Sequence, residues 1–135
     1  MPFVQIYYPE GSLNKEELKK ASSNIHESLI EHFNIPIDDY FHMCLPYPPN
    51  QFFYDSSYLL EDKKKRTDKM IYLSITCAPG RTITQKRNLY ESISEALYHH
   101  LNIPTTDIFI TLNETSIENW SFGQGKAQMV EHRVE

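Results

Sequence analysis

Pro2, the second residue of the chain, is the residue that could perform the most unusual chemistry. Proline at this position is small enough for an aminopeptidase to remove Met1, and removal would leave Pro2 with a free secondary amine. Such an amine is a stronger and more rigid base and nucleophile than a primary α-amine. Because an unperturbed α-amino group has a pKa of about 7.7–8.0, its surroundings decide whether it acts as base or acid. We expect the mature chain to begin at Pro2, since a retained Met1 would make that nitrogen an amide without basicity.

The composition indicates one globular domain without a membrane segment. The chain has 135 residues, of which 40% are hydrophobic and 13% aromatic, so it is long enough to bury a real core. No apolar run approaches the ~20 residues of a membrane span. The start of the chain lacks the basic and apolar regions of a signal peptide. We therefore expect a single domain over residues 1–135, located in the cytoplasm.

Charge and cysteine content narrow the possible partners. The net charge is −5, which argues against a nucleic-acid-binding protein. Cys44 and Cys77 are the only cysteines, and both fall in apolar runs, as expected for reduced, buried thiols. None of the six histidines has metal-ligand spacing to cysteine or carboxylate partners. We expect no metal, no cofactor, no nucleic acid and no membrane partner.

Two segments of the chain are alike at an offset of 68 residues. Asn34-Ile-Pro36 returns as Asn102-Ile-Pro104. The same offset relates Ile25 to Ile93, Leu29 to Leu97, His32 to His100, Asp39 to Asp107 and Phe41 to Phe109. Because the repeat is half the chain, it indicates a duplicated unit rather than a solenoid.

Each repeat unit has the pattern of a strand, a helix and a second strand. Residues 3–8 and 70–76 are apolar and aromatic, as strands are. A capping-box pattern follows at Asn14 and again at Thr82, and each precedes a run with apolar residues every three or four positions. The Asn-Ile-Pro segments end both predicted helices, because proline disfavours helical backbone in the residue before it.

The strands that follow the helices, residues 40–45 and 108–112, complete the fold prediction. A strand–helix–strand unit of this length forms a parallel pair with a right-handed crossover. Two such units, about 2–45 and 70–112, predict an α+β fold with a four-stranded mixed sheet and two helices on one face. The other face has no cover of its own, and its simplest cover is another copy of the protein.

Two segments lie outside the repeat. Residues 46–69 form a linker that opens with the structure-breaking Pro-Tyr-Pro-Pro, and a further short strand is expected at 51–54. Residues 113–135 form a C-terminal tail that carries Gly123 and Gly125.

Three motifs, together with Met-Pro before a strand and the duplicated unit, resemble the tautomerase superfamily. They are Ile-Pro-Ile-Asp-Asp-Tyr at residues 35–40, Thr-Cys-Ala-Pro-Gly-Arg-Thr-Ile-Thr-Gln-Lys at 76–86, and Asn-Trp-Ser-Phe-Gly-Gln-Gly-Lys-Ala-Gln at 119–128. The last motif is the most specific, because Trp-Ser-Phe-Gly-x-Gly is not a generic loop. Within the superfamily the chain looks most like the malonate semialdehyde decarboxylase group, over nearly its whole length.

The resemblance implies a tautomerase fold, a homotrimer and a set of catalytic residues. It implies a catalytic proline at Pro2, an acidic partner at Asp39, and an arginine at Arg81 that binds the substrate carboxylate. The chain departs from the family pattern at Ala78, which falls where a second arginine is expected. This departure bears on the identity of the substrate.

The same resemblance implies an apolar wall of the pocket. Trp120 and Phe122 would form this wall, and Met129 stands where the family has another aromatic residue. His26, on the first predicted helix, is a further candidate to reach the pocket. Asp107 is instead interpreted as a turn or capping carboxylate, because only one unit can bring its aspartate to the start of the chain.

The charges around Pro2 decide which chemistry its amine performs. A nearby carboxylate raises the pKa of an amine, so Asp39 would keep Pro2 protonated, whereas burial and a cation such as Arg81 would lower that pKa. A protonated Pro2 can polarise a carbonyl. A neutral Pro2 can shuttle a proton or form an iminium with an aldehyde. The sequence leaves the roles of acid, base and Schiff-base nucleophile open.

Two classes of function fit these residues. The first is a cofactor-free enzyme that tautomerises, decarboxylates or hydrates small oxo-acids, with Arg81 holding the substrate carboxylate in a bidentate pair. The second is a non-catalytic small-ligand-binding or regulatory module of the same fold, which a retained Met1 would favour.

Overall fold

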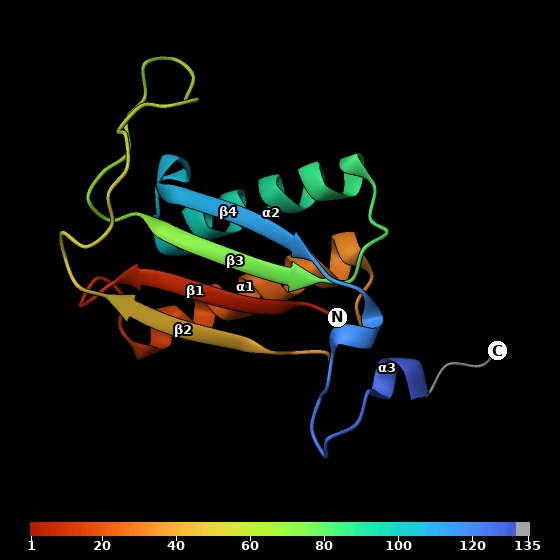
Figure 1. Ribbon diagram of the computed structural model, residues 1–135. Coiled ribbons are helices and arrows are strands. Elements are labelled where there is room, and N and C mark those ends of the chain that lie inside the picture. Colours follow the sequence, from red (N-terminus) through yellow and green to blue (C-terminus); the bar gives the residue numbers. More distant parts are fainter. Residues whose placement is uncertain (132–135) are drawn as a thin grey trace.

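The chain folds around a four-stranded sheet in a computed structural model that describes residues 1–131 (Figure 1). The strands lie in the order β2-β1-β3-β4. The elements follow the chain as β1 (Phe3–Pro9), α1 (Lys15–Phe33), β2 (His42–Tyr47), β3 (Ile71–Cys77), α2 (Ile83–Leu101), η1 (Thr105–Asp107), β4 (Ile108–Glu114), η2 (Ile117–Asn119) and α3 (Gln128–Glu131). β1 runs parallel to β2 and β3 parallel to β4, while β1 and β3 are antiparallel. The prediction of a duplicated unit in a mixed α+β sheet is confirmed.

Both long helices begin and end as matched repeats. Asn14 and Thr82 each cap a helix, and in each case the third helical residue closes a capping box. Asn34 and Asn102 end the helices in the left-handed conformation, with φ of 54° and 56°. The left-handed asparagine therefore ends each helix two residues before the proline that the sequence offers as the stop signal.

Two details of the linker differ from the sequence prediction. β2 continues through Pro46 to Tyr47, beyond the predicted linker boundary, and Pro46 lies opposite Tyr8 of β1. Proline is tolerated there because β2 is an edge strand with one side unpaired. The strand expected at residues 51–54 is wrong, since these residues have no regular secondary structure.

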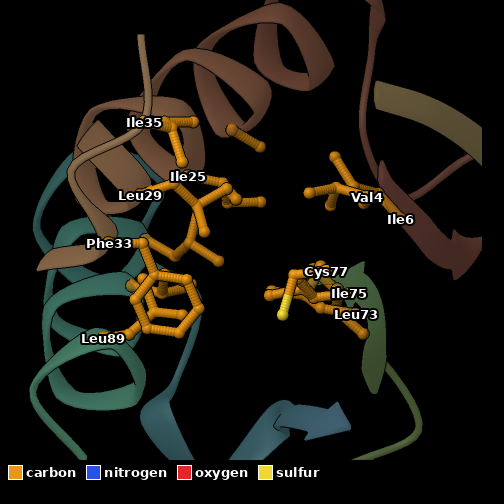
Figure 2. Close-up of a cluster of buried hydrophobic side chains, with 14 of the residues drawn as sticks. Val4, Ile6, Ile25, Leu29, Phe33, Ile35, Leu73, Ile75, Cys77 and Leu89 are labelled. Atoms are coloured by element: carbon orange, nitrogen blue, oxygen red, sulfur yellow. The ribbon is translucent and has the colours of Figure 1, made fainter. Parts of the chain in front are cut away.

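The core lies between the sheet and the two helices (Figure 2). Side chains of α1 and α2 face those of β1 and β3, and their central members are almost completely buried. They include Val4, Ile6, Ile25, Leu29, Leu73, Ile75, Leu89, Ile93 and Leu97. Full burial of one such side chain stabilises the fold by about 1.5–3 kcal/mol. This core fixes the sheet on which the candidate site is built.

The face of the sheet away from the helices carries a stripe of aromatic side chains. Tyr7 stacks on Tyr72 with ring centroids 5.4 Å apart, and Tyr72 contacts Phe109 at 5.3 Å. Phe109 remains 46% exposed, and Met43 on the edge strand is 52% exposed. Figure 1 shows α1 and α2 together on the opposite side of the sheet.

The start of the chain lies at one end of the sheet, where three connecting segments meet (Figure 1). Because β1 and β2 begin at this end and β3 and β4 finish there, the loop before β2, the loop after β3 and the tail after β4 all reach it. The linker emerges at the opposite end. In residues 1–131, neither long helix has the length and apolar character needed to cross a membrane.

Candidate active site

The amino group of the chain lies against the carboxylate of Asp39. The nitrogen of Met1 is 3.1 Å from Oδ2 of Asp39. The Met1 residue is only 8% exposed, and Pro2 behind it is fully buried. The start of the chain is therefore enclosed by protein, with Asp39 as its charged neighbour.

The loop between α1 and β2 carries Asp39 to this position. The Asp39 amide donates to the Pro36 carbonyl at 3.1 Å, which closes a turn directly after the helix stop. The Val4 amide then donates to the Phe41 carbonyl at 3.0 Å and ties the end of the loop to β1. Between these two bonds the Asp39 side chain is left 15% exposed and turned to the start of the chain.

Asp107, the repeat mate of Asp39, has a different environment. It is 1% exposed, and its carboxylate accepts hydrogen bonds from the Thr67 amide at 2.8 Å and the Thr67 hydroxyl at 2.5 Å. Asp107 thus anchors the end of the linker to η1. The two aspartates occupy equivalent places in the repeat, but only Asp39 faces the start of the chain.

A cavity of about 340 Å³ opens beside Met1 and Asp39. Its lining is mostly apolar and comes from the start of the chain, the α1–β2 loop and the tail. The residues are Met1, Pro36, Asp38, Asp39, Phe41, Phe122 and Met129. Three of the predicted site residues, Asp39, Phe122 and Met129, therefore surround one cavity next to Pro2.

Phe41 is a wall residue that the sequence reasoning missed. Its ring centroid lies 5.4 Å from that of Phe122, so the α1–β2 loop and the tail form one aromatic surface. The signal was available, because Phe41 follows Asp39 by two residues. Because Phe41 matches Phe109 in the repeat, it was interpreted only as part of the duplicated unit.

The tail holds its aromatic residues through a local hydrogen-bond pair. The Phe122 amide donates to Oε1 of Gln128 at 2.9 Å, and Nε2 of Gln128 donates to the Gly123 carbonyl at 2.7 Å. Trp120 stacks on Phe122 with centroids 5.7 Å apart and planes 8° apart. Trp120 thus packs against Phe122 and does not itself line the cavity.

Arg81 lies on the loop after β3, at the C-terminal end of α1. Its guanidinium donates to the Ala78 and Phe33 carbonyls, each at 3.1 Å, and its central carbon is 4.9 Å from the centre of the Phe33 ring. Arg81 does not line the cavity that contains Asp39. The predicted carboxylate-binding arginine is therefore engaged with backbone oxygens.

The positive charges of Arg81 and of the start of the chain nevertheless both influence the pKa of the same thiol, that of Cys77. Burial raises the pKa of Cys77, and the positive charges of Arg81 and the chain terminus both oppose that rise. Cys77 ends β3, just before the loop that carries Arg81. The two positive groups therefore lie at the same end of the sheet.

Metal-binding geometry is absent from the described residues. Within residues 1–131, no three His, Cys, Asp or Glu side chains are grouped as a metal site requires. The sixth histidine, His132, lies outside the described range.

Known proteins match the chain over nearly all of its length. Two family models, both described as tautomerase enzyme, match residues 2–54 and 39–123. A probable tautomerase of Bacillus subtilis (strain 168), YusQ, is 44% identical over 131 residues, covering 97% of this chain and 100% of the relative.

Solved structures match the fold equally broadly. A malonate semialdehyde decarboxylase inhibited by 3-bromopropiolate has a TM-score of 0.87 at 25% identity, with coverage of 96% of this chain and 95% of that one. A fused 4-OT, described as a symmetric trimer, has a TM-score of 0.76 at 13% identity, with coverage of 97% and 99%. The second likeness concerns the fold alone.

Proposed function

Because this chain belongs to the tautomerase family and is an enzyme of that superfamily, we propose that its working group is the Pro2 amine, set free by removal of Met1. The observation that carries the proposal is the contact of 3.1 Å between the chain's amino group and Asp39, beside a largely apolar cavity. The substrates we propose are small oxo-acids.

Removal of Met1 would change this site in two ways. The start of the chain would retreat by one residue, about 3.3–3.6 Å, so that a secondary amine replaces the Met1 ammonium near Asp39. The space that Met1 now fills would join the cavity. Both changes favour a small ligand bound between the Pro2 nitrogen and the aromatic wall of Phe41 and Phe122.

Asp39 is proposed to set the proton state of Pro2. A carboxylate beside an amine favours the charged form and raises its pKa, against the lowering effect of burial. A protonated Pro2 can polarise the carbonyl of a 3-oxo acid, so that the electrons of the breaking carbon–carbon bond move toward that carbonyl, CO2 leaves and an enol remains. The neutral fraction of Pro2 can instead take the proton from the oxygen of an enol and give it to the neighbouring carbon, which yields the oxo form.

Arg81 is proposed to bind the substrate carboxylate. Its hydrogen bonds to the Ala78 and Phe33 carbonyls use only part of the five N–H donors of the guanidinium, and the side chain is only half-buried. Because Ala78 stands in place of a second arginine, this loop suits a substrate with one carboxylate. The apolar wall suits a substrate whose other part is apolar.

We also propose a homotrimer. The aromatic stripe on the open face of the sheet is partly exposed in the single chain, and burying it against further copies would remove apolar surface from water. The fused 4-OT that shares this fold is described as a trimer.

The test of the function combines intact mass with turnover. We expect the purified chain to lack Met1 and to convert the enol of phenylpyruvate, malonate semialdehyde, or both. Pro2→Ala should lose about 10²–10⁴-fold in kcat/KM, the usual contribution of a positioned proton-transfer group. A chain that keeps Met1 and turns over neither substrate would instead support the ligand-binding module of the same fold.

A further inference from the structure

A polar cluster joins α1 to the loop that carries Asp39 and to the start of β2. We call Ser22, His26, Tyr40 and His42 the α1–β2 cluster. The Ser22 hydroxyl lies 2.6 Å from the Tyr40 hydroxyl and 2.8 Å from Nδ1 of His42. The Tyr40 ring contacts both histidine rings, with centroids 4.2 Å from His26 and 4.7 Å from His42, and the two histidine rings are 5.8 Å apart. None of these side chains lines the cavity beside Met1.

His26 holds this loop on both sides of Asp39. Its Nε2 lies 2.7 Å from the Ile37 carbonyl, two residues before Asp39, and its ring stacks on Tyr40, one residue after, with planes 9° apart. Because a carbonyl only accepts, Nε2 must carry the hydrogen. His26 is only 6% exposed, so it contacts the loop from the protein interior.

The second repeat unit shows that the fold does not require this cluster. At the offset of 68 residues, His26 corresponds to Ser94, Tyr40 to Ile108 and His42 to Ile110. The equivalent aspartate, Asp107, is held by direct hydrogen bonds from Thr67. In the first unit the carboxylate of Asp39 contacts the start of the chain, and His26 holds the neighbouring residues Ile37 and Tyr40 instead.

We propose that His26 is a positioning residue for Asp39. It fixes the backbone at Ile37 and the ring of Tyr40, and thereby places the Asp39 carboxylate against the chain-start amine. The inference rests on the proposed function in one respect, that Asp39 sets the proton state of Pro2. His26 itself does not contact the substrate cavity.

Two substitutions separate the parts of this role. His26→Gln keeps an N–H donor that can reach the Ile37 carbonyl, and His26→Phe keeps the ring against Tyr40 but removes the donor. We expect His26→Phe to lower the pKa of the 15N-labelled Pro2 amine toward its value in Asp39→Asn, and to lower kcat about tenfold, the equivalent of one lost hydrogen bond. His26→Gln should retain most of both. When His26→Phe is combined with Asp39→Asn, the pKa of Pro2 should not fall further than in Asp39→Asn alone.

His32→Phe is the matched control. His32 is a half-buried histidine of the same helix, and its side chain lies beside Glu31 at a hollow lined by α2 residues, so its substitution should leave Pro2 unchanged. If His26→Phe does not fold, His26→Asn replaces it, because the shorter amide cannot reach from the position of Nε2.

Amide hydrogen exchange keeps this inference separate from the proposed function. The Asp39 amide, which donates to the Pro36 carbonyl, should exchange about tenfold faster in His26→Phe than in His26→Gln. If Asp39→Asn leaves the pKa of Pro2 unchanged, the proposed role of Asp39 fails and the exchange result decides whether His26 positions the loop. Wild-type exchange at residues 37–40 and a wild-type Pro2 pKa in His26→Phe, with only a lower melting temperature, would overturn it.

Discussion

Asp39 and Asp107 show how one residue type takes two roles at equivalent positions. Asp107 is completely buried and receives two hydrogen bonds from Thr67. Asp39 is partly exposed and lies against the chain's amino group. The partner that each carboxylate finds, and not its place in the repeat, therefore decides whether it can take part in proton chemistry.

His42 gives a prediction about acid stability. Burial, with a smaller contribution from His26, lowers the pKa of His42 from 6.5 to about 4. Between pH 6.5 and 4 the unfolded chain therefore binds a proton at His42 that the folded chain does not. This group should destabilise the fold by up to about 3 kcal/mol as the pH falls through that window.

Urea unfolding of wild type and His42→Gln between about pH 7 and pH 4 measures this effect. Carboxylates also titrate in both proteins, so the informative quantity is the difference between the two proteins in the unfolding free energy that each loses. Wild type should lose more stability than His42→Gln. Parallel losses would mean that His42 titrates normally in the folded protein.

At the scale of elements, the repeat predicted most of the secondary structure. The capping boxes at Asn14 and Thr82 and the paired asparagines that end the helices are local signals, so they can be identified without the fold. The extension of β2 through Pro46 depends on its place at the edge of the sheet, which the local sequence does not show.

The helix ends give a prediction for Asn34. Its φ of 54° is adopted readily by glycine and by asparagine, whereas alanine and most other residues are strained there by roughly 1–2 kcal/mol. Asn34→Ala should therefore lower the free energy of unfolding by about 1 kcal/mol, and Asn34→Gly should change it little. Equal losses in urea unfolding of the two variants would contradict the role of the left-handed cap.

The site was less predictable than the elements, for a physical reason. Motifs identified Asp39, Phe122 and Met129, which line the cavity together. They could not show that the Arg81 guanidinium is engaged by the Phe33 carbonyl, because that contact joins segments 48 residues apart. Phe41 was missed for a related reason, since its value as a wall depends on the tail folding back onto it.

At the scale of the whole molecule, the open face of the sheet predicts the assembly. We expect light scattering to give the mass of a trimer. Phe109→Glu places a charge in the aromatic stripe, where Phe109 is 46% exposed, and should shift the protein toward monomers. Tyr98→Glu is the matched control, because Tyr98 is 51% exposed on α2, on the helix-covered side. A wild-type monomer at micromolar concentration would contradict the trimer.

The most direct test of the central claim is a titration of the Pro2 amine. Pro2 labelled with 15N in the mature protein should titrate at a higher pKa in wild type than in Asp39→Asn, because the carboxylate favours the protonated amine. We expect a decrease of about one unit or more in the variant, with a sharp loss of decarboxylation and a smaller effect on tautomerisation. An identical pKa in the two proteins would show that Asp39 is only a turn residue, and would contradict the account of how Pro2 is controlled.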